Sequence, residues 1–139
     1  MTPDRDPCSR AGFEHGSSAE MLVFGCGEDD LAVLRSTWAA EGRVLCAVET
    51  PADFAKHAIE HRPVAVFLGV AKRTLEHFDL IPVVRAARGD LPVIVIADED
   101  SLDLERRARQ RSIFYYLVHP LDRAEVEAVL HDILRRSRG

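Results

Sequence analysis

The sequence lacks the cysteine pattern and the leader segment of a secreted protein. Its three cysteines, Cys8, Cys26 and Cys46, share no CxxC spacing. The first twenty residues contain acids and no apolar core, so we do not expect them to be a signal peptide. An odd cysteine count without a secretion signal is typical of reduced thiols, and we expect a cytoplasmic location.

Long hydrophobic runs and a basic surplus are also missing. The uncharged stretch 63–71 is bounded by Arg62 and Lys72, and it is far shorter than the roughly 18 apolar residues of a membrane span. The net charge is -5, which disfavours direct nucleic-acid binding. With 139 residues, 47% of them hydrophobic, the chain has the size and composition of one globular domain.

Catalytic and metal-binding motifs are equally scarce. The sequence contains no HExxH and no GxSxG, and its one ligand-like pair, His57 and His61, fits an exposed helix face better than a metal site. Cys26 at a helix N-terminus could carry a nucleophilic thiolate, but the favoured interpretation is that it is a small buried residue. We therefore expect no catalytic residue, no metal and no cofactor, and a protein that is not an enzyme.

From residue 20 onward, apolar segments of strand length alternate with helical patterns, whereas residues 1–19 show no apolar period and predict a flexible tail. Residues 71–78 are expected to form a loop. The expected strands are 21–26, 44–48, 64–70, 92–97 and 113–118, and the expected helices are 28–40, 51–61, 79–88, 101–111 and one that Asp122 opens with Glu125 as its capping partner.

Five β–α units predict an α/β fold, a doubly wound parallel sheet with helices on both faces. Ligands of such sheets bind at the carboxyl ends of the strands. The first strand there leads into Gly25-Cys26-Gly27, and the second ends in Glu49, which partly matches a dinucleotide-binding pattern. Asp30 replaces the third glycine, and the acids at 28–30 would repel a pyrophosphate, so a tight turn with helix-capping acids is favoured.

Three segments carry a family likeness: EHRPVAVFLGV (60–70), LPVIVIAD (91–98) and YLVHPLDRAEV (116–126). With them, the chain resembles a bacterial response-regulator receiver domain of the CheY-like type, over residues 20–139. The resemblance implies a flavodoxin-like (βα)5 fold with five parallel strands in the order 2-1-3-4-5. It also implies a cis bond between His119 and Pro120.

The family's phosphorylation chemistry is not matched. In receivers an aspartate at the end of the third strand accepts the phosphoryl group, an acidic pair after the first strand holds Mg²⁺, a Ser or Thr follows the fourth strand, and a Lys precedes the proline. The corresponding residues are Gly69 for the acceptor, Gly25, Cys26 and Gly27 for the acidic pair, Ala97 for the hydroxyl residue, and His119 before Pro120 for the lysine, while the aromatic switch position survives as Tyr116.

Glycine supplies no carboxylate nucleophile, and the Gly-Cys-Gly turn offers Mg²⁺ only backbone carbonyls. Four nearby acids, Asp98, Glu99, Glu28 and Asp29, could form a weak metal site, but exposed loop acids and helix caps are the favoured interpretation. The resemblance therefore implies a pseudo-receiver, which acts as a protein-interaction module in two-component (phosphorelay) signalling or transcription regulation. The alternative is a small-molecule or nucleotide sensor that uses the vacated acidic pocket.

The receiver likeness also implies an output surface on the helix at 101–111, the fifth strand and the last helix. Alternation along that strand places Tyr115 opposite Phe114 and Tyr116, so we expect an exposed aromatic residue beside the basic cluster. The residues of this surface are Tyr115, Tyr116, Arg106, Arg107 and Arg111. The expected partner is a protein, with a homodimer through this face as an alternative, and neither nucleic acid nor membrane is expected to bind.

Overall fold

The computed structural model describes residues 20–138, so the tail expected over residues 1–19 lies outside the described part. Within it, strands and helices alternate as the sequence predicts. The elements are β1 (Glu20–Phe24), α2 (Glu28–Ala39), β2 (Val44–Val48), α3 (Pro51–Glu60), β3 (Ala65–Val70), η1 (Lys72–Asp79), α4 (Leu80–Ala87), β4 (Val93–Ala97), α5 (Leu102–Arg109), β5 (Tyr115–Val118) and α6 (Arg123–Arg138).

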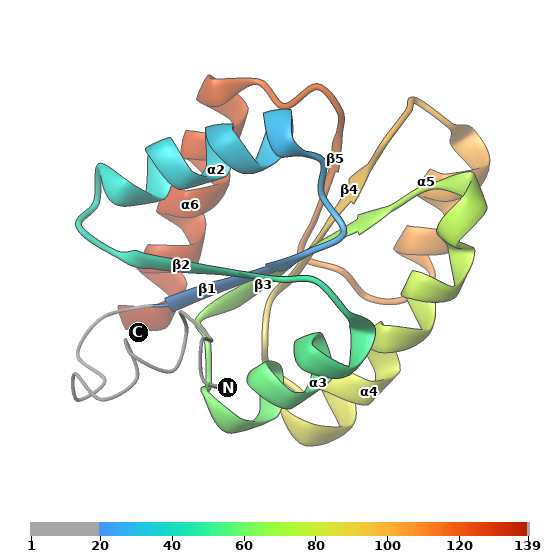
Figure 1. Cartoon of the computed structure of the whole chain (residues 1–139), viewed down its shortest axis with the longest axis horizontal. Coiled ribbons are helices and arrows are strands. Elements are labelled where there is room, and N and C mark those ends of the chain that lie inside the picture. The colour runs from blue at the N-terminus through green and yellow to red at the C-terminus, as the bar shows by residue number, and fades with distance from the viewer. Residues whose placement is uncertain (1–19, 139) are drawn as a thin grey trace, which may run out of the picture.

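The strands form one parallel sheet in the order β2-β1-β3-β4-β5, which confirms the predicted topology. Helices α2 and α6 cover one face of the sheet, and α3, α4 and α5 cover the other (Figure 1). Strands β2 and β5 are its two edges. The predicted cis peptide bond between His119 and Pro120 is present.

Two hydrophobic cores hold the three layers together. Every residue of β3 and β4 is buried, as strands covered on both faces require. Leu34 and Trp38 of α2 pack with the apolar stripe of α6 on one face. Phe54 of α3 and Leu104 of α5 pack on the other face. The residues of the α6 stripe are buried, namely Val126, Val129, Leu130, Ile133 and Leu134.

Side-chain caps fix the starts of three helices. Thr50 accepts a hydrogen bond from the backbone N–H of Asp53 at 3.0 Å, and Ser101 accepts one from Leu104 at 3.2 Å. Asp122 accepts one from the N–H of Glu125 at 3.0 Å, which confirms the predicted start of α6. Each cap satisfies a donor that the first helical turn leaves without an internal partner.

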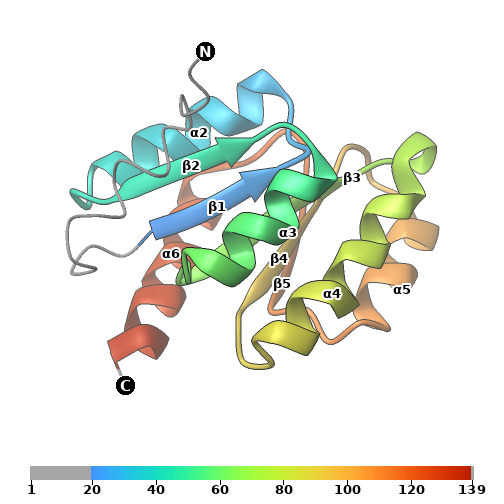
Figure 2. The ribbon, with the colours of Figure 1, turned by 60° about the horizontal axis from the view of Figure 1, so that its bottom comes forward.

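The segment after β3 differs from the sequence prediction. Residues 71–78 were expected to form a loop, but residues 72–79 form the 3₁₀ helix η1, which leads directly into α4. A short 3₁₀ segment has no apolar period long enough to detect in a sequence. On this face of the sheet, α4 lies between α3 and α5 (Figure 2).

The exposure of His57 was predicted wrongly. His57 was expected on an exposed helix face but is buried at 5% exposure, whereas the nearby Ile59 is 46% exposed. The rotation of α3 is set by Phe54 and Ala58, and His57 lies next to them on the buried side. Hydrophobicity alone could not choose between the two neighbouring faces of this short helix.

The start of β5 also corrects a prediction. The strand begins at Tyr115 rather than Ile113, so strand alternation does not extend back to Phe114. Phe114 and Tyr115 both pack on the side of α6, with ring centres 5.3 Å apart in an edge-to-face arrangement. Tyr116 packs on the opposite side, against the core under α3, α4 and α5.

The expectation of reduced thiols is wrong at one cysteine. Cys46 is disulfide-bonded, and Cys26 is the free cysteine of residues 20–138.

None of the helices in the described part of the chain is long and apolar enough to cross a membrane.

Candidate functional site

The carboxyl ends of β1 and β3 meet through two glycines. A Cβ atom on Gly69 would lie 2.3 Å from the carbonyl oxygen of Gly25, and a Cβ on Gly25 would lie 2.7 Å from the carbonyl oxygen of Gly69. Gly25 also has a φ of 89°, which residues with a side chain rarely adopt. The position of the expected phosphoacceptor is therefore filled by the facing backbone, and there is no room for a side chain.

A cavity of about 360 Å³ opens beside this contact. Its walls come from the β1–α2 turn, the β3–η1 segment and the ends of β4 and β5. The structure thus brings Gly25, Cys26, Gly27 and His119 together as predicted. The residues that line it are Gly25, Cys26, Gly27, Asp30, Val70, Ala71, Arg73, Thr74, His77, Ile96, Asp98 and His119. Gly69 and Ala97 are buried next to this cavity without lining it.

Asp30 is the buried acid of the site, at 4% exposure, and it is not an exposed helix cap as predicted. Its Oδ2 atom lies 2.8 Å from Nδ1 of His119, and its Oδ1 atom accepts a hydrogen bond from the N–H of Leu121 at 3.1 Å. Both partners belong to the β5–α6 connection, so one carboxylate joins α2 to that loop. A buried carboxylate requires such partners.

His77 contributes a second imidazole from η1. Its Nδ1 atom lies 2.9 Å from the carbonyl oxygen of Gly69. A carbonyl only accepts hydrogen bonds, so Nδ1 carries the hydrogen, and in the neutral ring Nε2 is left as an acceptor. The ring also contacts Phe24, with centres 4.7 Å apart, which fixes its orientation at the wall of the cavity.

Cys26 is partly buried, and its side chain packs against the core between the sheet and helices α2 and α6. Burial, followed by the charge of Asp30, raises the pKa of Cys26 to about 12. Little thiolate is then expected near neutral pH, although Cys26 precedes the N-terminus of α2. Both observations favour a packing role for Cys26 over the nucleophilic alternative.

The Mg²⁺ ion that the receiver likeness implies does not fit these residues. Mg²⁺ requires hard oxygen ligands, but Gly25, Cys26 and Gly27 offer carbonyls and a protonated thiol, and Asp30 is engaged by His119. Two other acids at this edge form surface ion pairs, Asp98 with Arg73 at 3.6 Å and Glu99 with Lys72 at 3.1 Å. Over residues 20–138, no group of three or more His, Cys, Asp or Glu residues could hold a metal ion.

The predicted output surface is divided between the two sides of β5. Tyr116 lies near α5, where the guanidinium carbon of Arg109 is 5.8 Å from its ring centre. Burial, followed by the charges of Glu105 and Asp100, raises the pKa of Tyr116. Tyr115 instead donates a hydrogen bond to Asp132 of α6 at 2.7 Å, so its predicted place beside the α5 arginines is wrong.

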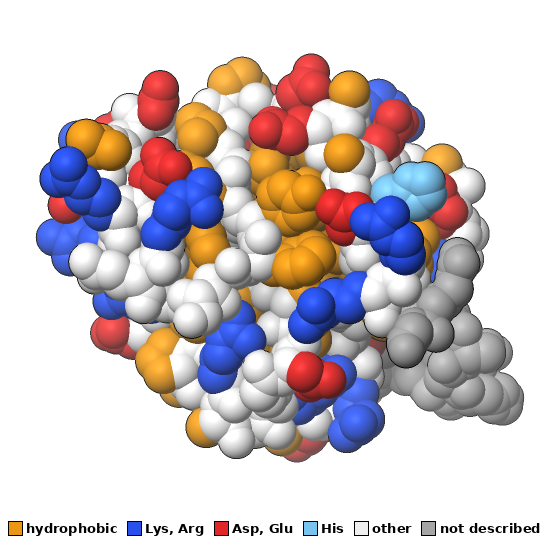
Figure 3. All heavy atoms as spheres, turned by 180° about the vertical axis from the view of Figure 1, so that it is seen from behind, with side chains coloured by type: hydrophobic (Ala, Val, Ile, Leu, Met, Phe, Trp, Pro, Cys, Tyr) orange, Lys and Arg blue, Asp and Glu red, His pale blue; other side chains and the backbone are white. Residues whose placement is uncertain are grey.

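The basic residues of α5 have different contacts. Arg107 pairs with Asp103 one helical turn away at 3.1 Å, and Arg111 stacks over the ring of Phe78 at 4.8 Å. The side chain of Arg106 is exposed and makes no hydrogen bond or ion pair within residues 20–138. Seen from behind, where α5, β5 and α6 lie, hydrophobic side chains gather in the middle of the face and Lys or Arg side chains lie on both sides of them (Figure 3).

Two residues of the site, Asp30 and His77, were not predicted from the sequence to belong to it. Asp30 had a usable signal, because it lies four residues before Leu34 and eight before Trp38, on the buried face of α2. His77 had none, since only the path of η1 brings it back to Gly69.

Comparison with solved structures identifies the arrangement. A response regulator from Thermotoga maritima superposes with a TM-score of 0.75 at 14% identity, covering 85% of this chain and 98% of that one. A CheY-like protein (tadZ) from Pseudomonas aeruginosa gives a TM-score of 0.72 at 13% identity, covering 84% of this chain and 99% of that one. The chain has the fold of response-regulator receiver domains. The cavity therefore lies at the edge where the receiver fold ends its strands.

Sequence relatives agree with the receiver fold. The transcriptional regulatory protein PrrA is 28% identical in Mycobacterium tuberculosis and 29% identical in Mycobacterium leprae, over 120 residues or 86% of this chain. The match covers 52% of those proteins, so this chain spans about half the length of the curated relatives it matches. No protein-family model matches the chain.

Proposed function

We propose that the chain is a pseudo-receiver, a receiver-type domain that takes no phosphoryl group and acts as a protein-interaction module in bacterial two-component signalling or transcription regulation. The backbone contact between Gly25 and Gly69 carries this proposal. It leaves neither a carboxylate to accept the phosphoryl group nor space for one, and phosphoryl transfer to an aspartate needs both.

The surrounding residues support the same function. Ala97 has no hydroxyl to contact a phosphoryl group, and Nδ1 of His119 is directed to Asp30 at 2.8 Å. Without a phosphoryl group at this edge, no new contact would draw Tyr116 inward. Tyr116 already packs against the core, and we propose that the surface around α5, β5 and α6 holds one constitutive conformation.

Acetyl phosphate with Mg²⁺, followed by intact-mass spectrometry, tests the proposal. We expect no gain of a phosphoryl mass in this chain, while a receiver with an acceptor aspartate gains one under the same conditions. An acid-labile phosphoryl mass mapped to any residue at the strand ends would contradict the pseudo-receiver function.

We propose a protein partner for the surface formed by α5, β5 and α6, with a second copy of the chain as the alternative occupant. Aromatic side chains flanked by arginines are the composition of binding hot spots. We further propose that the protein acts in the cytoplasm without enzymatic activity and without direct contact to nucleic acid or membrane. The net charge of -5 supports the absence of direct nucleic-acid contact.

The cavity of about 360 Å³ favours a second candidate function, the binding of a small molecule or nucleotide. Its volume is in the range of ligand sites, and His77 and His119 provide polar groups at its wall. A thermal-shift screen with nucleotides and divalent metals separates the two functions, because a ligand of the folded state must raise the midpoint. A raised midpoint that is lost in His77→Ala would favour the sensor.

A further inference from the structure

Three arginines converge at the opposite edge of the sheet, where β3 and β4 begin. Arg62 precedes β3, Arg88 lies between α4 and β4, and Arg136 lies near the end of α6. Together they line a hollow of about 440 Å³. Among the described residues that line it, Asp90 alone carries a carboxylate, so three guanidinium groups face one negative charge.

Two of these arginines are oriented by groups that do not neutralise them. Nη1 of Arg88 donates to the carbonyl oxygen of Pro63 at 2.8 Å, and Nη2 of Arg136 donates to the carbonyl oxygen of Asp90 at 3.3 Å. The guanidinium carbon of Arg136 also lies 5.4 Å from the ring centre of Phe114. Within residues 20–138, none of the three forms an ion pair with a carboxylate, and each keeps further N–H donors for a ligand.

Arg135, the neighbour of Arg136 on α6, differs from these three arginines because it has an ion-pair partner. Arg135 pairs with Asp132 at 2.6 Å, so its charge is compensated within the same helix. Arg62 has no such partner among residues 20–138, and it has a φ of 51°, at a helix end where glycine is the common residue. Arg62 thus lies beside the hollow in a backbone conformation that is unfavourable for arginine.

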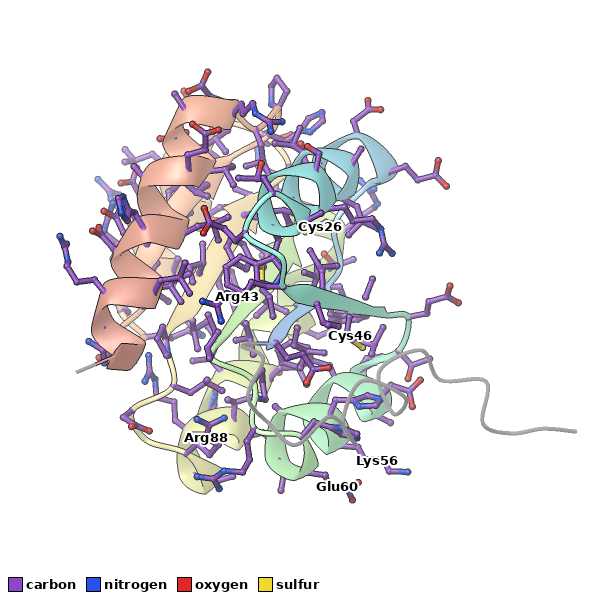
Figure 4. The ribbon with its side chains drawn as sticks, turned by 90° about the vertical axis from the view of Figure 1, so that its left-hand side faces the viewer. Cys26, Arg43, Cys46, Lys56, Glu60 and Arg88 are labelled. Carbon is purple, nitrogen blue, oxygen red and sulfur yellow. The ribbon has the colours of Figure 1, made fainter. Side chains whose placement is uncertain are left out.

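In the protein without a ligand, the positive charge of Arg62 repels that of Arg88. Burial, followed by the charge of Arg62, lowers the pKa of Arg88, and Asp90 offsets this only in part. A bound anion would relieve that repulsion. Figure 4 shows Arg88 beside the end of α4, below the C-terminal end of α6 in this view.

The remaining walls are apolar. Pro63, Pro92 and Ile133 line the hollow and are buried, so a ligand with a nonpolar part would also find contact there. A concave hollow of this size fits a small molecule better than a flat protein surface.

We propose that this hollow binds a small diphosphate-bearing anion. Guanidinium forks match the paired oxygens of phosphate groups and are chosen for that recognition over other cations. A diphosphate carries enough charge to neutralise three arginines, whereas one carboxylate does not. The site lies at the opposite end of the strands from Gly69, so this inference goes beyond the pseudo-receiver function and stands or falls independently of it.

Isothermal titration of the full chain with inorganic pyrophosphate at constant ionic strength tests the proposal. We expect one site per chain, and binding at least about tenfold weaker in the double variant Arg62→Asn/Arg136→Gln, because two charge-assisted contacts are lost. Asparagine is chosen because it tolerates the left-handed backbone. Arg88 is left intact because it supports Pro63. The matched control Arg35→Gln, an exposed change on α2, should bind as the wild type does.

Thermal melts without ligand establish that the variants are folded, and the single variant Arg136→Gln replaces the double variant if the latter is unfolded. Three results would overturn the site: no heat with millimolar pyrophosphate, equal affinity in the arginine variants, or equal weakening in Arg35→Gln. Binding of a polyglutamate peptide without binding of pyrophosphate would also overturn it, since the ligand class would then be wrong.

Discussion

At the scale of single residues, Gly69 has the most specific requirement. A Cβ there would lie 2.3 Å from a backbone oxygen, which cannot move without shifting the β1–α2 turn. We predict that Gly69→Asp lowers the free energy of unfolding by about 3 kcal/mol or more, because overpacking against backbone is costly. We also predict that this variant does not regain phosphorylation by acetyl phosphate. Urea denaturation and intact-mass spectrometry measure the two effects.

Gly27→Asp is the matched control for that substitution. A Cβ on Gly27 meets no atom within 4 Å, and Gly27 is the N-cap of α2 without a side-chain cap. Aspartate is favoured at that position, so its stability should stay within about 0.5 kcal/mol of the wild type or rise. If Gly69→Asp is as stable as Gly27→Asp, the backbone contact does not exclude a side chain.

Cys26 predicts a pH dependence of stability. Its pKa is raised from 9.0 to about 12 in the folded protein, so above pH 9 the unfolded chain loses a proton that the folded chain keeps. Stability from this thiol is therefore complete below pH 9 and falls by about 1.4 kcal/mol per pH unit above it. Urea denaturation at about pH 8 and about pH 10 should show this loss in the wild type and not in Cys26→Ala. Equal losses in both proteins would contradict the assigned burial of the thiol.

The role of a residue could be predicted where the receiver likeness assigned that role to its place in the sequence. It could not be predicted where the role depends on a contact with a residue far away in the sequence. Gly25, Cys26, Gly27 and His119 were expected to meet at one cavity, and they do. The partner of His119 was missed, because an acid at a helix start has two explanations, capping and burial. Only the helical face shared with Trp38 distinguishes them.

At the scale of elements, α2 is fastened to the β5–α6 loop by Asp30. Removing that carboxylate leaves the N–H of Leu121 and Nδ1 of His119 without their acceptor. We predict that Asp30→Ala lowers the free energy of unfolding by about 2–3 kcal/mol, the cost of leaving the buried N–H of Leu121 and the partly exposed imidazole of His119 without an acceptor. The exposed neighbour Asp29→Ala should change it by less than about 0.5 kcal/mol. Equal effects in a chemical denaturation series would show that Asp30 has no such role.

The helix α5 offers a test of the interaction surface. Arg106 and Arg107 are exposed on it, and Arg109 and Arg111 contact Tyr116 and Phe78. We predict that Arg106→Glu/Arg107→Glu keeps the fold but weakens binding of the protein partner, or dissociates a dimer, by about tenfold or more. Arg35→Glu, a single charge reversal on α2, is the control. Size-exclusion chromatography with light scattering reports the oligomeric state, and a partner affinity and oligomeric state that do not change would place the surface elsewhere.

Elements with a strong pattern were predictable to within a few residues. The second strand was expected over 44–48 and is Val44–Val48, because five consecutive apolar residues end at Glu49 and follow Gly42 and Arg43. The 3₁₀ helix η1 and the start of β5 were not predictable, since the first has no apolar period and the second depends on which residue first pairs with β4.

At the scale of the whole molecule, the receiver fold places three surfaces at separate positions. The glycine contact and its cavity lie at the carboxyl ends of the strands, the arginine hollow at their amino ends, and the aromatic face at the β5 edge. The order of strands follows from alternating β–α units with buried parallel strands, which is why the fold could be predicted while the arginine hollow could not. Arg62, Arg88 and Arg136 are far apart in the sequence, and only the packed layers bring them together.

The central claim is that this receiver fold works without a phosphorylation switch. Beryllofluoride with Mg²⁺ imitates the phosphoryl group on an acceptor aspartate, and amide NMR spectra of the whole chain report any change of conformation. We predict that the resonances of α5, β5 and the β5–α6 loop remain unchanged, while a receiver with an acceptor aspartate shows shifts in the same elements. Saturable shifts at Gly69, Tyr116 and α5 in this chain would contradict the claim.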